Sequence, residues 1–324
     1  MPSTLEDIQN AAQRIKPYIH RTPVLTNASL DEAVGAQVFL KCENMQKVGV
    51  FKFRGASNAV WSLSDEEAAY GVCTHSSGNH AQALALAAKM RGIPAYIVMP
   101  NNAPSVKKNA VAGYGGQITF CEPTLEARET TLERIRLDTG ATMVHPYNDE
   151  RVIAGQGTAA LELLEDVPDL DVVIAPVGGG GLLSGTAIAA TEIKRGIRVI
   201  AAEPEKADDA YRSMQAGKIV PSVRPQTIAD GLLTSLGLLT FPILQARVEK
   251  VVTVSEQGII DAMKFIWERT KMIIEPSAAV AVGVLWEKKI DVQGLKVGVI
   301  LSGGNVDLES LPWHASHADN KARQ

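Results

Sequence analysis

A lysine between two phenylalanines is the strongest chemical signal in the sequence. Lys52 lies in the run VFKFRG, residues 50–55. A lysine in an apolar pocket loses solvation of its charged form, so its pKa falls and it becomes a nucleophile toward carbonyls and a base near neutral pH. An enzyme with an aldehyde cofactor needs such an amine. The alternative is a strand lysine whose aliphatic stem passes apolar neighbours.

Four consecutive glycines, Gly178 to Gly181, provide a second signal. They follow an apolar run and precede a helical pattern that begins at Leu182. Glycines let backbone N–H groups approach an anion, and a helix N-terminus adds positive potential. The segment therefore predicts a phosphate site, with a structural turn as the alternative. It does not match G-x-G-x-x-G, and the chain lacks G-x-x-x-x-G-K-[ST], so dinucleotide and P-loop interpretations are disfavoured.

Two further polar turns follow predicted strands, at residues 76–80 (SSGNH) and 302–305 (SGGN). The hydroxyls, amide and helix N-terminus of the first suit a carboxylate, although Ser77 or Asn79 could simply cap the helix. His80 by itself fits a hydrogen-bonded structural histidine better than a catalyst. Ligands in parallel α/β sheets bind beyond the carboxyl ends of strands, so these turns and the glycines can converge on one crevice. With Lys52 they would form a phosphate site, an amino-acid carboxylate site and an imine-forming lysine.

Short apolar strands alternate with helical patterns along the chain. This alternation predicts an α/β fold with parallel sheets and helices on both faces. Neither an internal repeat nor a long low-complexity linker is evident, so two interleaved lobes are expected. The predicted strands are 38–40, 70–74, 95–99, 117–120, 172–177, 198–202 and 297–302, and the predicted helices are 81–90, 105–113, 125–139, 182–195, 256–270 and 277–286.

Composition is that of a globular cytoplasmic protein. The chain has 324 residues, a net charge of -4 and a pI of about 5.9, so neither nucleic acid nor an anionic membrane is an expected partner. The first residues lack the pattern of a secretory signal, and the uncharged stretch 172–191 is interrupted by Pro176 and the glycines. Cys42, Cys73 and Cys121 show no CxxC spacing and fit reduced, buried thiols.

Together these motifs resemble the serine/threonine dehydratase and serine racemase family, the fold-type-II pyridoxal phosphate (PLP) enzymes. The resemblance covers roughly residues 5–312 and is carried by residues 51–55, 76–80, 178–181 and 302–305. It implies a homodimer with a tryptophan synthase β-like fold, in which PLP lies between two parallel-sheet lobes. The large domain would comprise residues 1–69 and 150–313, a small mobile domain residues 70–149, and a flexible tail residues 314–324. No C-terminal regulatory domain is expected.

The resemblance also assigns roles around the cofactor. Lys52 would form the imine with PLP, and Phe51 would lie against its ring. Asn79 would bond the ring hydroxyl and Ser302 the pyridine nitrogen, and a serine partner there favours elimination over transamination. The phosphate would be held by Gly178, Gly179, Gly180, Gly181 and Leu182, and the substrate carboxylate by Ser76, Ser77, Gly78, Asn79 and His80.

The implied function is serine racemisation together with β-elimination of water from serine, which gives pyruvate and ammonia. Lys52 would remove the Cα proton from its own face. Ser77 matches the serine that serves the opposite face in the racemases, where plain dehydratases commonly have alanine; a helix cap is the alternative. A dedicated L-threo-3-hydroxyaspartate or L-threonine dehydratase is the second candidate. A non-catalytic sensor of PLP or amino acids is a remote third.

Two residues bear on a dicarboxylate substrate. Arg128 and Ser235 match positions that hold the distal carboxylate of dicarboxylate ligands in the racemases. An arginine suits that bidentate contact, although Arg128 could equally be a surface helix residue. If Arg128 is functional, 3-hydroxyaspartate becomes a credible substrate alongside serine.

A cation and a nucleotide are further expectations from the resemblance. Oxygen ligands for Mg²⁺, or for Ca²⁺ or Mn²⁺, would be Glu203, Asp209 and the carbonyl of Ala207, with a solvated acidic turn as the alternative. ATP binds some relatives at the dimer interface, through residues that match Lys47, Lys107, Tyr114 and Asn305. Val48 and Val50 replace the hydroxyl residues of the usual T-G-S-F-K, which argues against ATP as an effector. Tyr147 also differs from the smaller residue of mammalian racemases.

Overall fold

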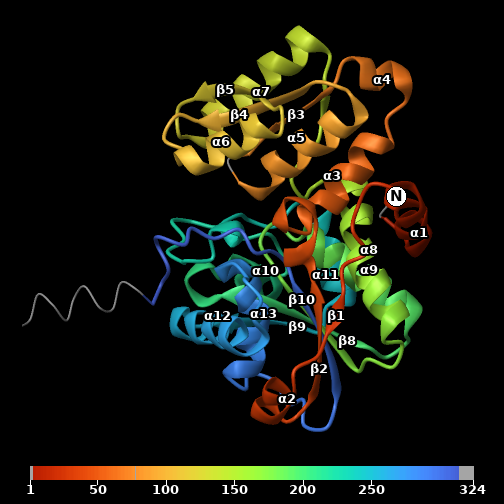
Figure 1. Ribbon diagram of the computed structural model, residues 1–324, viewed down its shortest axis with the longest axis vertical. Coiled ribbons are helices and arrows are strands. Elements are labelled where there is room, and N and C mark those ends of the chain that lie inside the picture. Colours follow the sequence, from red (N-terminus) through yellow and green to blue (C-terminus); the bar gives the residue numbers. More distant parts are fainter. Residues whose placement is uncertain (1–2, 77, 314–324) are drawn as a thin grey trace, which may run out of the picture.

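The computed structural model describes residues 3–76 and 78–313, which form two lobes, each built on one β-sheet (Figure 1). The larger sheet has six strands, in the order β1-β2-β10-β7-β8-β9. β1 is antiparallel to β2, and every other neighbouring pair is parallel. The strands are β1 (Val24–Leu25), β2 (Gln37–Cys42), β7 (Val172–Pro176), β8 (Arg198–Pro204), β9 (Lys250–Val254) and β10 (Lys296–Leu301).

Helices cover both faces of this sheet. Side chains alternate along a strand, so Val172 and Ile174 of β7 enter one core while Val173 and Ala175 enter the other. The first core is closed by α2 (Ala28–Val34), α12 (Glu256–Thr270) and α13 (Pro276–Trp286). The second is closed by α1 (Leu5–Ile15), α8 (Glu150–Asp166), α9 (Gly181–Ile193), α10 (Asp209–Ala216) and α11 (Thr240–Arg247).

The smaller sheet lies wholly within residues 72–143. Its four parallel strands have the order β5 (Gln117–Cys121), β4 (Ala95–Pro100), β3 (Val72–His75) and β6 (Thr142–Met143). Its helices are α5 (Asn79–Arg91), α6 (Ser105–Gly113) and α7 (Leu125–Thr139). Two earlier helices, α3 (Lys52–Trp61) and α4 (Asp65–Ala69), share a core with α5 through Phe53, Ala68 and Leu84. The α/β class with two parallel-rich sheets is confirmed, while the domain boundary at residue 69 stays a prediction.

Several elements were not predicted from the sequence, among them α3 and α8. Both helices are buried along most of their length, at residues 53–60 of α3 and 152–164 of α8. The described residues also include four short 3₁₀ helices: η1 (Glu43–Met45), η2 (Lys47–Gly49), η3 (Glu205–Ala207) and η4 (Asp230–Leu232). The three cysteines are free and buried, as predicted. Within residues 3–76 and 78–313, every helix is too short or too polar to span a membrane.

Candidate functional site

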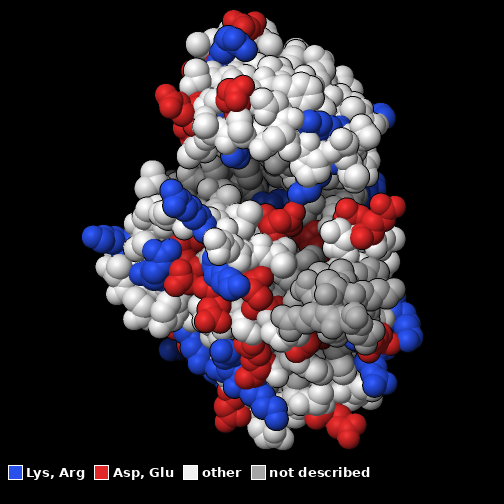
Figure 2. All heavy atoms as spheres, turned by 90° about the vertical axis from the view of Figure 1, so that its left-hand side faces the viewer, with Lys and Arg blue, Asp and Glu red and all other residues white. Residues whose placement is uncertain are grey.

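The three predicted loops all follow the carboxyl ends of parallel strands. Ser76 follows β3, the glycine run follows β7, and Ser302 follows β10. In the space-filling view a hollow separates the two lobes, and both basic and acidic side chains reach its walls (Figure 2). This is the arrangement in which a parallel α/β sheet binds a ligand.

The segment before Lys52 is tied to the end of β10. The N–H of Phe51 donates to the carbonyl of Ser302 at 2.9 Å, and Val50 forms an antiparallel bridge with Gly303. Asn305 donates its side-chain amide to the carbonyl of Val48, at 2.9 Å. Val48 has a φ of 55°, which a β-branched residue rarely adopts. These contacts hold the entry to α3 beside the Ser302 turn.

Lys52 is the first residue of α3, so the strand alternative is wrong. Its Nζ donates to the carbonyl of Pro146 at 2.8 Å and lies 5.1 Å from the centre of the Phe51 ring. Burial lowers the pKa of Lys52 to about 8, and the negative charge of Glu275 opposes this change. An amine that loses its proton this easily can attack an aldehyde and exchange protons near neutral pH.

The glycine run is shaped by close backbone approach. A Cβ on Gly179 would lie 2.3 Å from the Tyr147 ring, and one on Gly180 would lie 2.8 Å from Thr240. Gly180 also has a φ of 92°, and α9 begins at the next residue without a side-chain cap. The run therefore ends in a helix N-terminus whose first N–H groups have no partner within the helix, as an anion site requires.

The turn before α5 is also uncapped by a side chain. Gly78 occupies the N-cap position, and its own N–H donates to Ser76 Oγ at 3.3 Å. Asn79 does not cap the helix, because its amide donates to Glu275 and its oxygen accepts from Asn305 at 2.9 Å. Ser77 lies outside the described residues. The α5 N-terminus can bind a carboxylate, and an Asn79 contact with the cofactor hydroxyl stays a prediction.

Glu275 is a buried carboxyl that the sequence reasoning missed. Each of its oxygens lies 3.1 Å from the Asn79 amide, and Oε2 also accepts the N–H of Asn305 at 3.2 Å. Burial raises the pKa of Glu275 to about 7, although the bonds from Asn79 and Asn305 oppose the increase. The only sequence signal was an acidic residue before Pro276 in an otherwise apolar stretch.

Three histidines lie around this site. His80 is buried, with Nε2 at 3.1 Å from the carbonyl of Val144, as expected for a hydrogen-bonded structural histidine, and a role beside the substrate stays a prediction. His145 accepts N–H bonds on Nδ1 from Tyr147 and Asn148, so that nitrogen carries no proton. Burial lowers the pKa of His80 to about 3 and that of His145 to about 4. The His75 ring meets the His145 ring edge-on, with centres 6.4 Å apart.

Arg128 and Ser235 differ in how they are engaged. Arg128 is half-buried on α7, and among residues 3–76 and 78–313 its buried Nε has no hydrogen-bond partner. Burial, and then the charge of Arg128, lower the pKa of His75 at the end of β3. Ser235 accepts the N–H of Ser222 at 2.8 Å and keeps its hydroxyl hydrogen for another acceptor.

The expected cation ligands form a carboxylate pair. Glu203 accepts the N–H groups of Ala210 and Tyr211 at 2.7 and 2.8 Å, and Asp209 Oδ2 is buried with no partner in the described part of the chain. Burial raises the pKa of Glu203 to about 8 and that of Asp209 to about 6. In the described part of the chain no three or more His, Cys, Asp or Glu side chains are grouped so that they could hold a metal ion, so the remaining ligands would be carbonyls and water. The residues fit a hard cation.

The expected nucleotide residues are occupied by contacts within the chain. Lys107 forms a 2.7 Å ion pair with Asp230, across the two lobes. Lys47 lies 5.9 Å from the centre of the Phe53 ring, Tyr114 lies against the core of the smaller lobe, and Asn305 bonds Val48 and Asn79. ATP binding stays a prediction.

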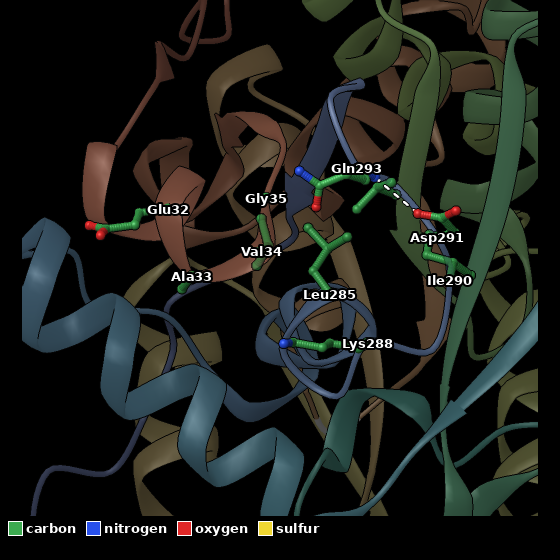
Figure 3. Close-up of a pocket in the computed structure, with 10 residues that line it drawn as sticks. Glu32, Ala33, Val34, Gly35, Leu285, Lys288, Ile290, Asp291 and Gln293 are labelled. Atoms are coloured by element: carbon green, nitrogen blue, oxygen red, sulfur yellow. Dashed lines mark hydrogen bonds between the residues drawn. The ribbon is translucent and has the colours of Figure 1, made fainter.

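A pocket of about 400 Å³ lies away from these loops, between α2 and the turn after α13 (Figure 3). Its polar side chains include Glu32, Lys288, Asp291 and Gln293. None of the predicted site residues lines it, so it is separate from the Lys52 site.

Comparison with known proteins defines the class. A family model described as pyridoxal-phosphate dependent enzyme matches residues 15–303, which include Lys52 and all three loops. The chain belongs to the fold-type-II PLP enzymes, in the family of serine racemases and β-hydroxyaspartate dehydratases. It is a PLP-dependent racemase or ammonia-lyase, so the enzyme interpretation is confirmed over the sensor.

Individual relatives divide between the two activities. The chain is 52% identical over 311 residues to a β-hydroxyaspartate dehydratase of Paracoccus denitrificans, covering 96% of this chain and 99% of that protein. It is equally 52% identical over 314 residues to a serine racemase of Dictyostelium discoideum, covering 95% and 96%. The crystal structure of a Dictyostelium discoideum serine racemase matches 94% of this chain and 99% of that one, with a TM-score of 0.92.

Proposed function

We propose that this enzyme eliminates water from β-hydroxy amino acids and accepts 3-hydroxyaspartate as a substrate. The observation that supports this best is Arg128, whose buried Nε lacks a partner in the described part of the chain while its charge acts on His75. A buried arginine donor without a partner is costly, and a carboxylate satisfies it. A second carboxylate on the β-carbon distinguishes 3-hydroxyaspartate from serine.

The residues around Lys52 can carry out the required steps. PLP, when bound, supplies an electron-withdrawing ring that acidifies the Cα hydrogen of the amino acid attached to it. The glycine run would hold its phosphate, and the α5 N-terminus would hold the substrate α-carboxylate. Lys52 would take the Cα proton at Nζ, since a pKa of about 8 allows it to bind and release protons near neutral pH. The β-hydroxyl leaves as water, and hydrolysis then gives a keto acid and ammonia.

Serine racemisation is the second candidate. It is favoured by Ser77, the residue that racemases carry at this position, and by the identity to a named serine racemase. Racemisation needs an acid on the face opposite Lys52, and Ser77 would serve there. The proposal also includes a homodimer. It further includes an Mg²⁺ ion that Glu203 and Asp209 would hold, in a structural role.

Two measurements test the proposal. Borohydride reduction of the purified enzyme, followed by peptide mass spectrometry, should place the cofactor on Lys52. A panel of L-serine, D-serine, L-threonine and the 3-hydroxyaspartate isomers should give the highest kcat/KM for a 3-hydroxyaspartate isomer, by about tenfold or more if Arg128 contributes one charge-assisted bond. Labelling at another lysine would refute the role of Lys52. Equal values for serine and hydroxyaspartate would refute the substrate assignment.

A further inference from the structure

Four buried charges lie behind the lysine helix. They are Lys41 on β2, Glu43 on η1, Arg54 on α3 and Glu162 on α8, and none is more than 8% exposed. The two positive and two negative charges balance. Arg54 is two residues after Lys52, and residues two apart on a helix point in nearly opposite directions. The cluster therefore lies on the side of α3 that faces away from the Lys52 amine.

Arg54 binds two carboxylates at once, each through two hydrogen bonds. Its Nε and Nη2 donate to Glu43 at 2.7 and 2.8 Å, and its Nη1 and Nη2 donate to Glu162, both at 2.8 Å. Lys41 Nζ donates to Glu162 at 2.6 Å and to the carbonyl of Thr22 at 2.7 Å. A planar guanidinium held in this way fixes direction as well as distance.

The crossing of α3 and α8 needs such a fixed direction. The two helices meet at glycines, where a Cβ on Gly155 would lie 2.6 Å from the Cα of Gly55. Glycines let the backbones approach closely, but they provide no side chain that would stop one helix from sliding along the other. The polar contacts across this crossing include Arg54 to Glu162 and Thr158, the N–H of Gly55 to Gln156 at 3.2 Å, and the Asn58 amide to the carbonyl of Arg151 at 2.7 Å.

The register of α3 against α8 directly affects the position of the Lys52 amine. α8 begins four residues after Pro146, whose carbonyl accepts Lys52 Nζ at 2.8 Å. A slide of α3 would change that distance. Burial lowers the pKa of Lys52, and the charge of Glu275 opposes this change. The balanced cluster would therefore act on Lys52 through geometry.

We propose that Arg54 is a positioning residue for Lys52: by binding Glu43 and Glu162 together, it holds α3 in the register that places Nζ against the carbonyl of Pro146. The inference rests on the proposed role of Lys52. The competing explanation is stability alone. Buried ion pairs are weak evidence for stability, because apolar residues often replace them without loss.

The test compares Arg54→Lys with the wild type. Lysine keeps the positive charge but cannot bind both carboxylates in two-bond geometry. In cofactor-free protein, acetylation of Lys52 by trace acetic anhydride is followed against pH by peptide mass spectrometry. In Arg54→Lys we expect the pH at which Lys52 acetylation is half-maximal to rise from about 8 toward the value for an ordinary lysine. In the holoenzyme we expect kcat to fall by about 10- to 100-fold, the effect of a misplacement on the order of 1 Å.

A matched control separates position from stability. Ile266→Ala removes a buried side chain from α12, in the core on one face of the larger sheet, and destabilises the fold without touching α3. It should leave the acetylation midpoint unchanged. If Arg54→Lys does not fold, the near-isosteric Glu162→Gln carries the same test. An unchanged Lys52 midpoint in the folded variant would overturn the inference. If the proposed role of Lys52 is wrong, borohydride reduction of the wild type will label another residue, which distinguishes that outcome from a failure of the Arg54 inference.

Discussion

The side-chain amide of Asn79 donates to both carboxylate oxygens of Glu275, at 3.1 Å each. Asn79 is the first residue of α5 in the smaller lobe, and Glu275 is the residue before α13, a helix that packs on one face of the larger sheet. The contact therefore joins the lobes beside Lys52. Because the carboxyl is buried, its ionisation opposes folding, and protonation near pH 7 would relieve that cost.

Glu275 should make the cofactor-free protein less stable as pH rises. Its pKa is raised from 4.5 to about 7 on folding, so its stabilising contribution is complete below pH 4.5 and is lost as pH approaches 7. The loss is at most about 3 kcal/mol, at 1.36 kcal/mol per pKa unit. Urea unfolding of Glu275→Gln should lack this loss. The exposed Glu268→Gln serves as the control, and parallel stability curves for Glu275→Gln and wild type would contradict the prediction.

Lys52 should lower the free energy of unfolding of the protein when no cofactor is bound. Its pKa falls from 10.5 to about 8 on folding, so its favourable contribution exists above pH 10.5 and is lost as pH falls through 8. Lys52→Met should therefore stabilise the cofactor-free protein at pH 7, by up to about 3 kcal/mol, and by less at pH 10. Urea midpoints at both pH values measure this. Lys218→Met, at an exposed position, should change neither, and a destabilised Lys52→Met at pH 7 would count against a buried amine.

The loops of the site could be predicted because each carries its own local signal. Glycine runs and serine turns after apolar strands must lie at strand ends, and parallel strands bring those ends together. The helices at 105–113, 125–139 and 256–270 also have the predicted bounds, and each is partly exposed.

The parts of the fold and site that were not predicted depend on contacts between segments far apart in the sequence. Glu275 meets Asn79 across 196 residues, and Arg54 meets Glu162 across 108. The neighbouring residues do not identify such a pair, because the local sequence does not distinguish a buried carboxyl from one on the surface. α3 and α8 were also not predicted; they pack against each other across a long stretch of sequence, with Gly55 against Gly155.

Arg128→Met should reduce turnover of 3-hydroxyaspartate more than that of serine. A buried charge-assisted hydrogen bond contributes about 1.5–3 kcal/mol, so kcat/KM for the dicarboxylate should fall about 10- to 150-fold. Coupled assays of keto-acid release measure both substrates. Arg134→Met, on an exposed face of the same helix, is the matched control. Equal losses for the two substrates would remove Arg128 from the distal-carboxylate role.

Ser77→Ala should separate the two proposed reactions. Elimination needs only Lys52 on one face, whereas racemisation also needs an acid on the other. We expect D-serine formation from L-serine to disappear while pyruvate formation continues. Chiral chromatography and a pyruvate assay on the same samples measure both. Loss of both activities together would instead favour a general role for Ser77 in the turn before α5.

Mg²⁺ should stabilise the enzyme through Glu203 and Asp209. Both carboxyls are buried, and Asp209 Oδ2 has no partner in the described part of the chain, so a cation would relieve an electrostatic cost that the fold otherwise carries. At 100 times its Kd, a ligand that binds only the folded state adds about 2.7 kcal/mol. Thermal unfolding should therefore show a higher Tm with Mg²⁺ than with EDTA. Asp209→Asn should abolish most of this increase, whereas Asp208→Asn, one residue earlier and half-buried, should retain it. An Mg²⁺ effect that survives Asp209→Asn unchanged would place the cation elsewhere.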